Sequence, residues 1–264
     1  MSSVTWCLAL AVLALGLQPA SPPAKPATQA PQQDLLFDHS HAAWTAVLER
    51  CVQGDRFDYR VLSESRGPLD EYLLRLRGVR PDELAAWTRA ERFAYWINAY
   101  NAFTVHAVLT RYPVESIEEV GTEDEPVWER KLAPLGHLLG GAEAELISLA
   151  AIEDDVLRAR FEDARVHAAL SRAAESGPPL RSEAYQAERL EPQLDEQARA
   201  WLANASLNRF DRERGRIEVS ALFEWRARDF ERDAGSLRAW IERFAPKEHS
   251  AWLAEAGELD LAVR

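Results

Sequence analysis

The sequence predicts an α+β fold in which helices dominate a small antiparallel sheet. Apolar residues recur at the three-four spacing of amphipathic helices along most of the chain. Near the carboxyl end, two short β-prone runs flank a turn that contains glycine, as in a hairpin. A hydrophobic content of 47% and nine tryptophans indicate a packed core rather than a disordered chain.

The amino terminus predicts a targeting segment followed by a linker. Residues 1–20 include the apolar run 6–17, which is too short to span a bilayer and typical of a signal-peptide core. Residues 21–34 are rich in Pro, Ala and Gln and predict a linker. We therefore expect a single domain over 35–264 that is exported to the periplasm or beyond, with no membrane span in the mature chain. Cleavage would remove Cys7 and leave Cys51 as the remaining cysteine. We interpret Cys51 as a small buried apolar side chain.

The first part of the domain predicts two helices separated by an extended piece. Residues 42–52 carry apolar side chains at helical spacing. A turn at 54–56 precedes residues 57–61, which we expect to be extended. Another helix is expected around residues 69–76.

The strongest pattern predicts a central helix between Thr88 and Tyr112. Thr88 and Glu91 form a capping box, and Pro113 ends the helix. One face of this helix is apolar, and its members are Phe93, Trp96, Ile97, Tyr100, Phe103, Thr104, Ala107 and Val108.

Three polar residues interrupt the central helix, namely Asn98, Asn101 and His106. Helical geometry places Asn98 and Asn101 at the border of the apolar face and His106 nearly opposite its centre. Two interpretations stay open: these groups bond loop backbone inside the core, or they take part in a pocket.

The second half predicts more helices and the hairpin. Ser148 is expected to cap one helix, and residues 190–202 form a second amphipathic stripe. Residues 207–210 and 216–219 flank the hairpin turn. The closing helices carry Phe223, Trp225, Phe230, Trp240 and Phe244.

Charge and motifs exclude several classes of function. A net charge of −12 disfavours a nucleic-acid partner, which needs clustered Lys and Arg. The sequence has neither a phosphate-binding glycine loop nor a Gly-x-Ser-x-Gly elbow, and no His, Cys and acidic cluster has zinc spacing. His39 and His41 are a weak metal-binding pair. The carboxylates of Glu115, Glu118 and Glu119 are interpreted as a solvated face, with calcium binding as the alternative. We expect no cofactor and no metal.

The loop from Arg165 to Arg181 has the composition of an active-site loop. His167 ends a short apolar run and is followed by Ser171, Ser176 and a Gly-Pro-Pro turn. A base held beside a rigid loop with hydroxyl groups is a common arrangement for nucleophilic catalysis.

Several motifs together resemble the family called domain of unknown function 547. The central helix reads Phe93-Ala-Tyr-Trp96-Ile-Asn98-Ala-Tyr-Asn101-Ala-Phe-Thr-Val-His106 and is followed by Arg111-Tyr-Pro113. Similar motifs occur, in the same order as in the family, at 54–59, 148–153, 165–181 and 222–230. The resemblance implies a thiol-hydrolase-like cleft, by analogy distantly papain- or transglutaminase-like.

The chain departs from the family's pattern in three motifs. Ser171-Arg172 stands where the family usually has Asn-Cys, and Ser176-Gly177-Pro178 stands where it has Ser-Cys-Pro. Asp154 replaces the histidine that usually follows Ile152-Glu153. An arginine cannot act as a nucleophile, because its guanidinium stays protonated.

Three hypotheses follow from these departures. In the first, the chain is a catalytically degenerate binding or accessory protein for an unknown small-molecule, peptide or protein ligand. In the second, it is a hydrolase or acyl transferase with His167 as base, Ser176 or Ser171 as nucleophile and Asn98 in orientation. In the third, the family's loop thiols form a disulfide that this chain has lost. We expect a binding protein rather than an enzyme, and we place the following polar or cleft residues around the site: Trp96, Asn101, His106, Arg165, Asp154 and Arg172.

Overall fold

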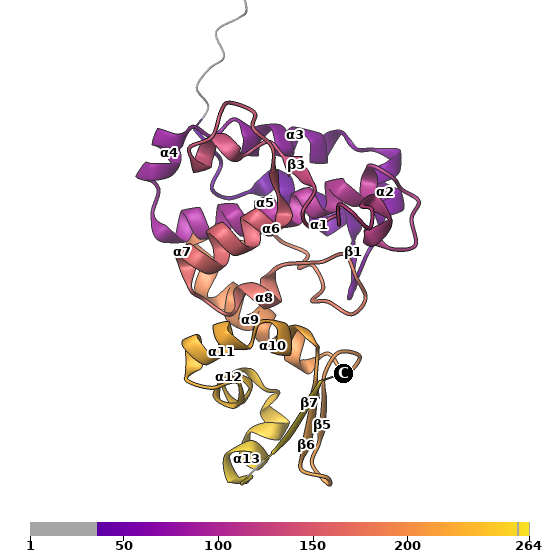
Figure 1. Ribbon diagram of the computed structural model, residues 1–264, viewed down its shortest axis with the longest axis vertical. Helices are drawn as coiled ribbons and strands as arrows, with labels where there is room; N and C mark the ends of the chain where they lie inside the picture. Colours follow the sequence, from indigo (N-terminus) through magenta and orange to yellow (C-terminus); the bar gives the residue numbers. More distant parts are fainter. Residues whose placement is uncertain (1–35, 258, 264) are drawn as a thin grey trace, which may run out of the picture. The chain divides into compact units, whose positions relative to one another are not determined.

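The computed structural model describes residues 36–257 and 259–263. The predicted signal peptide and linker, at 1–20 and 21–34, lie outside these residues. Within them, the chain is mostly helical with small sheets, which confirms the predicted α+β class (Figure 1).

The α-helices alternate with short strands and tight helical turns. The α-helices are α1 (Ala42–Cys51), α2 (Tyr59–Glu64), α3 (Gly67–Arg77), α4 (Pro81–Ala86), α5 (Arg89–Leu109), α6 (Leu149–Ala151), α7 (Ala159–Phe161), α8 (Val166–Ala169), α9 (Leu190–Ala203), α10 (Leu222–Trp225), α11 (Ala227–Ala234), α12 (Leu237–Phe244) and α13 (Lys247–Glu255). Three short 3₁₀ helices are η1 (Ile117–Val120), η2 (Gly136–Leu139) and η4 (Ala187–Arg189), and the π-helix is η3 (Ile152–Arg158). The strands are β1 (Val52–Gln53), β2 (Arg56–Phe57), β3 (Lys131–Ala133), β4 (Ile147–Ser148), β5 (Arg209–Asp211), β6 (Arg216–Val219) and β7 (Asp260–Val263).

The predicted central helix is α5, which packs against α2, α3 and η3. Its capping box is present, since the Thr88 side chain accepts from the Glu91 amide and the Glu91 carboxylate accepts from the Thr88 amide. The helix ends at Leu109, earlier than Tyr112, so the turn before Pro113 is not helical. Almost every residue of α5 from Phe93 onward is buried.

The expected extended piece at residues 57–61 is wrong beyond its first residue. Phe57 belongs to β2, but Tyr59 already begins α2. Asp58 caps this helix, because its carboxylate accepts a hydrogen bond from the Arg60 amide at 3.0 Å. An aspartate at the N-cap outweighs the β preference of the aromatic residues that flank it.

The helix expected after Ser148 forms, but most of it is a π-helix. Ser148 caps α6 by accepting from the Ala151 amide, and the chain then widens into η3. π-helical turns are rare and occur mostly at functional sites. The wider turn carries the acidic residues Glu153 and Asp154 together with Arg158.

The predicted hairpin is present as β5 and β6, whose antiparallel register pairs Phe210 with Ile217. A third strand, β7, was not predicted, and it pairs with β6 in parallel, so that this sheet is mixed. The carboxyl-terminal run of residues 260–263 is short and lacks the turn that would mark it as a hairpin partner.

The apolar interior is divided into separate clusters. The larger cluster surrounds α5 and includes Trp44, Trp96 and Leu194. A second cluster joins α9 to the carboxyl-terminal helices through Trp201 and Trp240. Figure 1 shows α12 beside α11, and α12 also packs against α9. No helix within the described residues has both the length and the apolar character needed to cross a bilayer.

Candidate functional site

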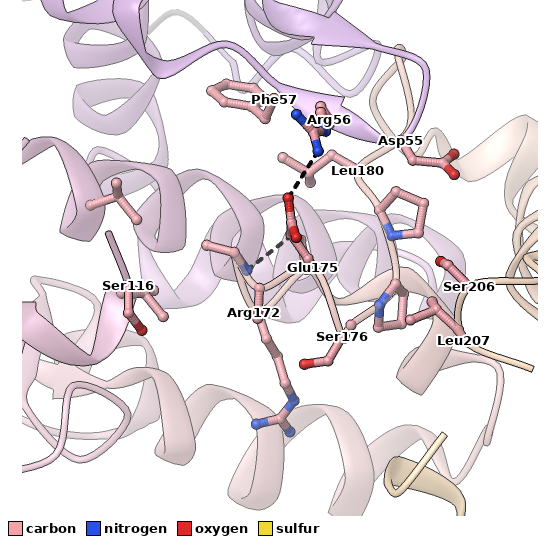
Figure 2. A pocket seen from close by; sticks show the side chains of 18 of the residues that line it. Asp55, Arg56, Phe57, Ser116, Arg172, Glu175, Ser176, Leu180, Ser206 and Leu207 are labelled. Atoms are coloured by element: carbon pink, nitrogen blue, oxygen red, sulfur yellow. Dashed lines mark hydrogen bonds and ion pairs between the residues drawn. The ribbon is translucent and has the colours of Figure 1, made fainter. Parts of the chain in front are cut away.

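A cleft of about 970 Å³ opens beside the loop at residues 171–180, which we call the Arg172 loop (Figure 2). Its other walls come from residues 55–59, from the end of α5 with the segment up to residue 117, and from residues 204–225. These segments are distant in sequence, so the cleft is built by the fold and not by one local motif.

Aromatic rings form much of the cleft lining. Phe57 and Tyr59 have ring centroids 4.8 Å apart, and those of Tyr59 and Tyr112 are 6.3 Å apart. Burial raises the pKa of Tyr59, so its phenol stays protonated. Trp225 lies in the lining of the cleft with 69% of its surface exposed. The lining also carries hydroxyl groups, on Ser116, Ser171, Ser176, Ser206 and Ser220.

Two buried amides of α5 hold the backbone at the two ends of the region that contains the Arg172 loop. Asn101 donates to the Ala169 carbonyl and accepts from the Ser171 amide, both at 2.9 Å. Asn98 donates to the Tyr185 carbonyl and accepts from its amide, at 2.8 and 3.0 Å. Both asparagines therefore bond loop backbone inside the core, as one of the two interpretations expected. With both amide atoms engaged, Asn98 has the bonding of a structural residue.

His167 is on α8 and points into the interior. Its Nε2 donates to the Asp229 carboxylate at 2.8 Å, and its side chain is 1% exposed. Burial lowers the pKa of His167, against the opposing hydrogen bond to Asp229, so the ring is neutral at pH 7. Burial would raise the pKa of Asp229, but hydrogen bonds from His167 and Arg158 outweigh it and lower that pKa.

The structure does not bring the predicted base and nucleophiles together. His167 is absent from the described residues that line the cleft, whereas Ser171 and Ser176 are present. The Ser171 hydroxyl accepts from the Ala173 amide at 3.3 Å. Within the described part of the chain, neither serine hydrogen-bonds to the His167 ring.

Arg172 extends from the loop onto a buried carboxylate. Its Nη2 donates to both oxygens of Glu153 at 2.7 Å, and Arg226 donates to the same carboxylate at 2.7 Å. The guanidinium carbon of Arg172 lies 5.4 Å from the ring centroid of Trp128. Glu153 is only 3% exposed, so its charge is compensated by these two arginines and not by water.

The contacts continue from Glu153 as a chain of alternating charges, which we call the charged seam. Arg226 also approaches Asp154 at 3.5 Å, and Asp154 accepts from Arg158 at 2.5 Å. Arg158 donates to Asp229 at 2.6 Å, and Arg232 lies 3.3 Å from the same carboxylate. The charged seam thus connects the cleft lining at Arg172 to the buried pair formed by Asp229 and His167.

The loop positions 172 and 177 face each other at the distance expected of a disulfide. A Cβ atom on Gly177 would lie 3.7 Å from the Cβ of Arg172. Disulfides have Cβ atoms about 3.5–4.5 Å apart. Gly177 has no positive φ, so a side chain at this position meets only ordinary contacts.

The other predicted polar residues lie away from the cleft. Trp96 is 2% exposed in the large apolar cluster, and His106 contacts the Arg66 guanidinium at 2.5 Å. Arg165 pairs with Asp163 at 2.6 Å and with two carboxylates of α9, Glu191 and Asp195. Burial opposes this charge, but the hydrogen bond from Arg165 to Asp163 and its other ion pairs raise its pKa.

Sequence reasoning missed several residues of the site. Glu153 and Asp229 were noted within family-like motifs, but without a role, and Arg226 was not singled out. Apart from the contact between Asp229 and Arg232, their partners are 19 to 73 residues away in the chain, so local sequence spacing does not predict these contacts. Tyr59 and Tyr112 were also missed, because they reach the cleft from separate segments.

Comparison with known proteins finds a match to a family model. The family model described as "Protein of unknown function, DUF547" matches residues 84–202. This segment includes α5, η3 and the Arg172 loop, whereas the motifs that carry the resemblance in the sequence extend from residue 54 to residue 230. No curated protein and no solved structure matches the chain.

Proposed function

Since the chain belongs to the DUF547 family, whose function is unknown, we propose that it is an exported binding protein without hydrolytic activity that holds a ligand in the cleft. The position of Arg172 carries this proposal. The resemblance implies a thiol at this position, and the residue present is a guanidinium bound to Glu153 and stacked on Trp128. A charged side chain so engaged has no nucleophilic atom.

The surroundings of His167 support the same proposal. A general base must reach the proton that it removes, within about 3 Å or through one water. The His167 ring is bound to Asp229 in the interior, outside the described lining of the cleft. The arrangement therefore favours a structural histidine over a catalytic base.

The geometry of positions 172 and 177 favours the lost-disulfide hypothesis for the family's loop thiols. The 3.7 Å separation between the Cβ of Arg172 and a Cβ on Gly177 fits a cystine. A bridge there would rigidify the loop beside the cleft, and its thiols would be unavailable as nucleophiles. In this chain, the bond from Arg172 to Glu153 ties the same loop to η3 instead.

Export is proposed from the apolar run at 6–17 and the small residues that follow it. Expression in a bacterial host, followed by fractionation and amino-terminal sequencing, tests this part. A mature amino terminus between about residues 20 and 25 in the exported fraction is expected, and uncleaved cytoplasmic protein would contradict it.

A fluorophosphonate probe that reacts with activated serines tests the absence of hydrolytic chemistry. We expect no labelling of the purified protein. Labelling that is lost in S176A or S171A, but kept in S206A, would overturn the proposal and support the serine-hydrolase alternative. Ser206 is the matched control, because it also lines the cleft but lies outside the Arg172 loop.

A further inference from the structure

Arg172 is a cation of the cleft with hydrogen-bond donors that bind no other described residue, and we infer that it binds a carboxylate group of the ligand. This inference rests on the proposed binding function and adds the chemical class of the ligand. It depends on the free donors of Arg172, on the charge balance of the seam, and on the placement of the other acids in the cleft.

The buried Glu153 carboxylate uses only one nitrogen of the Arg172 guanidinium. Nη2 makes both hydrogen bonds to Glu153, and one face of the guanidinium lies against Trp128. Within the described part of the chain, Nε and Nη1 have no hydrogen-bond partner. The side chain is 21% exposed and lines the cleft. A guanidinium that is anchored through one nitrogen, partly exposed and left with unused N–H donors is suited to a planar carboxylate.

The charged seam leaves one positive charge in excess. A single carboxylate, Glu153, is shared by Arg172 and Arg226. Along the whole seam, four guanidinium groups face three carboxylates, while the His167 ring is neutral. In a chain with a net charge of −12, this is a local reversal of sign beneath the cleft. Such a field attracts an anionic group to the Arg172 side.

The other acids of the cleft are placed so that they do not compete for Arg172. Figure 2 shows Glu175 turned toward Arg56 and away from the Arg172 guanidinium, and the pair lies at 3.1 Å. Asp55 accepts from the Asn204 amide at 3.1 Å. Glu115, on another wall, has no ion pair among the described residues. An anionic group is therefore repelled at Glu115 and attracted at Arg172, which orients the ligand.

The rest of the lining suits a ring or an apolar group attached to the carboxylate. Tyr59, Tyr112 and Trp225 offer aromatic faces, and the loop serines offer hydroxyl groups. A peptide carboxyl terminus and an acidic sugar share this chemistry. Matched probe pairs separate the two sources.

Nuclear magnetic resonance titration of the full chain tests the inference directly. The probes are N-acetylphenylalanine with its amide, and glucuronic acid with glucose. The readouts are the dissociation constant and the shift of the Arg172 Nε–H resonance, which a purely structural role would not move. We expect one acid to bind at least about tenfold more tightly than its neutral partner, with a shift at Arg172. The acid that binds identifies the source of the carboxylate.

Substitutions separate Arg172 from general electrostatics. R172Q is expected to remove the preference for the acid. The control R56Q/E175Q, which removes the other cation of the cleft together with the carboxylate paired with it, is expected to keep the preference. The double variant R172Q/E153Q removes the buried carboxylate as well, so it remains informative should R172Q alone fail to fold. Equal binding of acid and neutral probe, unchanged in R172Q, would overturn this inference and leave the binding function intact. Failure of all four probes to bind would count against both proposals.

Discussion

A double substitution, R172C/G177C, is predicted to form a disulfide across the Arg172 loop. The Cβ atoms at these positions lie 3.7 Å apart, within the range of native disulfides, and no positive φ opposes a side chain at 177. The bond closes a loop of six residues, 172–177. The chain-entropy relation gives about 7 cal/mol/K for such a loop, which is about 2 kcal/mol of stability at 25 °C.

The stability gain is measured as a difference within one variant. Loss of the bond from Arg172 to Glu153 destabilises the oxidised and reduced forms alike, so it cancels when the two are compared. Urea unfolding with and without reductant is expected to differ by about 2 kcal/mol for R172C/G177C. The single variants R172C and G177C, which cannot close the loop, are expected to show no such difference.

Peptide mapping tests whether the bond forms. With Arg172 replaced, residues 166–181 form one tryptic peptide that holds both new cysteines. Under oxidising conditions this peptide should escape alkylation and be lighter by two hydrogen atoms. Full alkylation of both cysteines, or unfolding that is unaffected by reductant, would refute the proposed geometry of the loop and the lost-disulfide hypothesis with it.

Three further predictions concern buried polar groups. His41 is buried, and its pKa is lowered to about 3 by burial and by His39. Because the unfolded chain takes up the proton at a higher pH than the folded chain, the free energy of unfolding should fall between pH 6.5 and 3, by up to about 5 kcal/mol. Urea unfolding of H41N should show a flatter dependence on pH. N101A leaves the Ala169 carbonyl and the Ser171 amide without their partner and should lower the free energy of unfolding by about 3 kcal/mol. The control Q53A, at an exposed amide, should change it by less than about 0.5 kcal/mol. D229N removes the carboxylate shared by Arg158 and Arg232 and weakens the bond to His167, while Arg158 keeps Asp154 as a partner. Thermal or urea unfolding should show a loss of about 3 kcal/mol, and a loss below about 1 kcal/mol would contradict the role of this carboxylate.

The local features of the fold were predictable from the sequence. The capping box at Thr88 and Glu91 involves residues three apart, and its geometry follows from helix structure alone. The β5–β6 hairpin is likewise a local pairing around one turn. The roles of Asn98 and Asn101 were only narrowed to two alternatives, because their partners, 87 and 68 residues away, depend on how the loops pack on α5.

The features that could not be predicted depend on distant segments meeting. β7 joins β6 in parallel after a long connection, and no turn signal relates the two strands. The cleft likewise combines four separate segments of the chain. His167 was expected to face a nucleophile because of its neighbours in sequence, but the direction of its side chain is set by Asp229, which lies 62 residues away.

The charged seam links two of the departures from the family's pattern, Asp154 and Arg172. Asp154 and Arg172 do not touch, but Arg226 contacts both Asp154 and Glu153, and Glu153 holds Arg172. An arginine at 172 adds positive charge to this group, and an aspartate at 154 adds the negative charge that offsets it. A neutral residue at 154 would leave two positive charges in excess in a partly buried site, where water compensates them only incompletely. The two departures therefore form one electrostatic unit: with Arg172 retained, D154N should be more destabilising than with R172Q, and a double-mutant cycle measures this coupling.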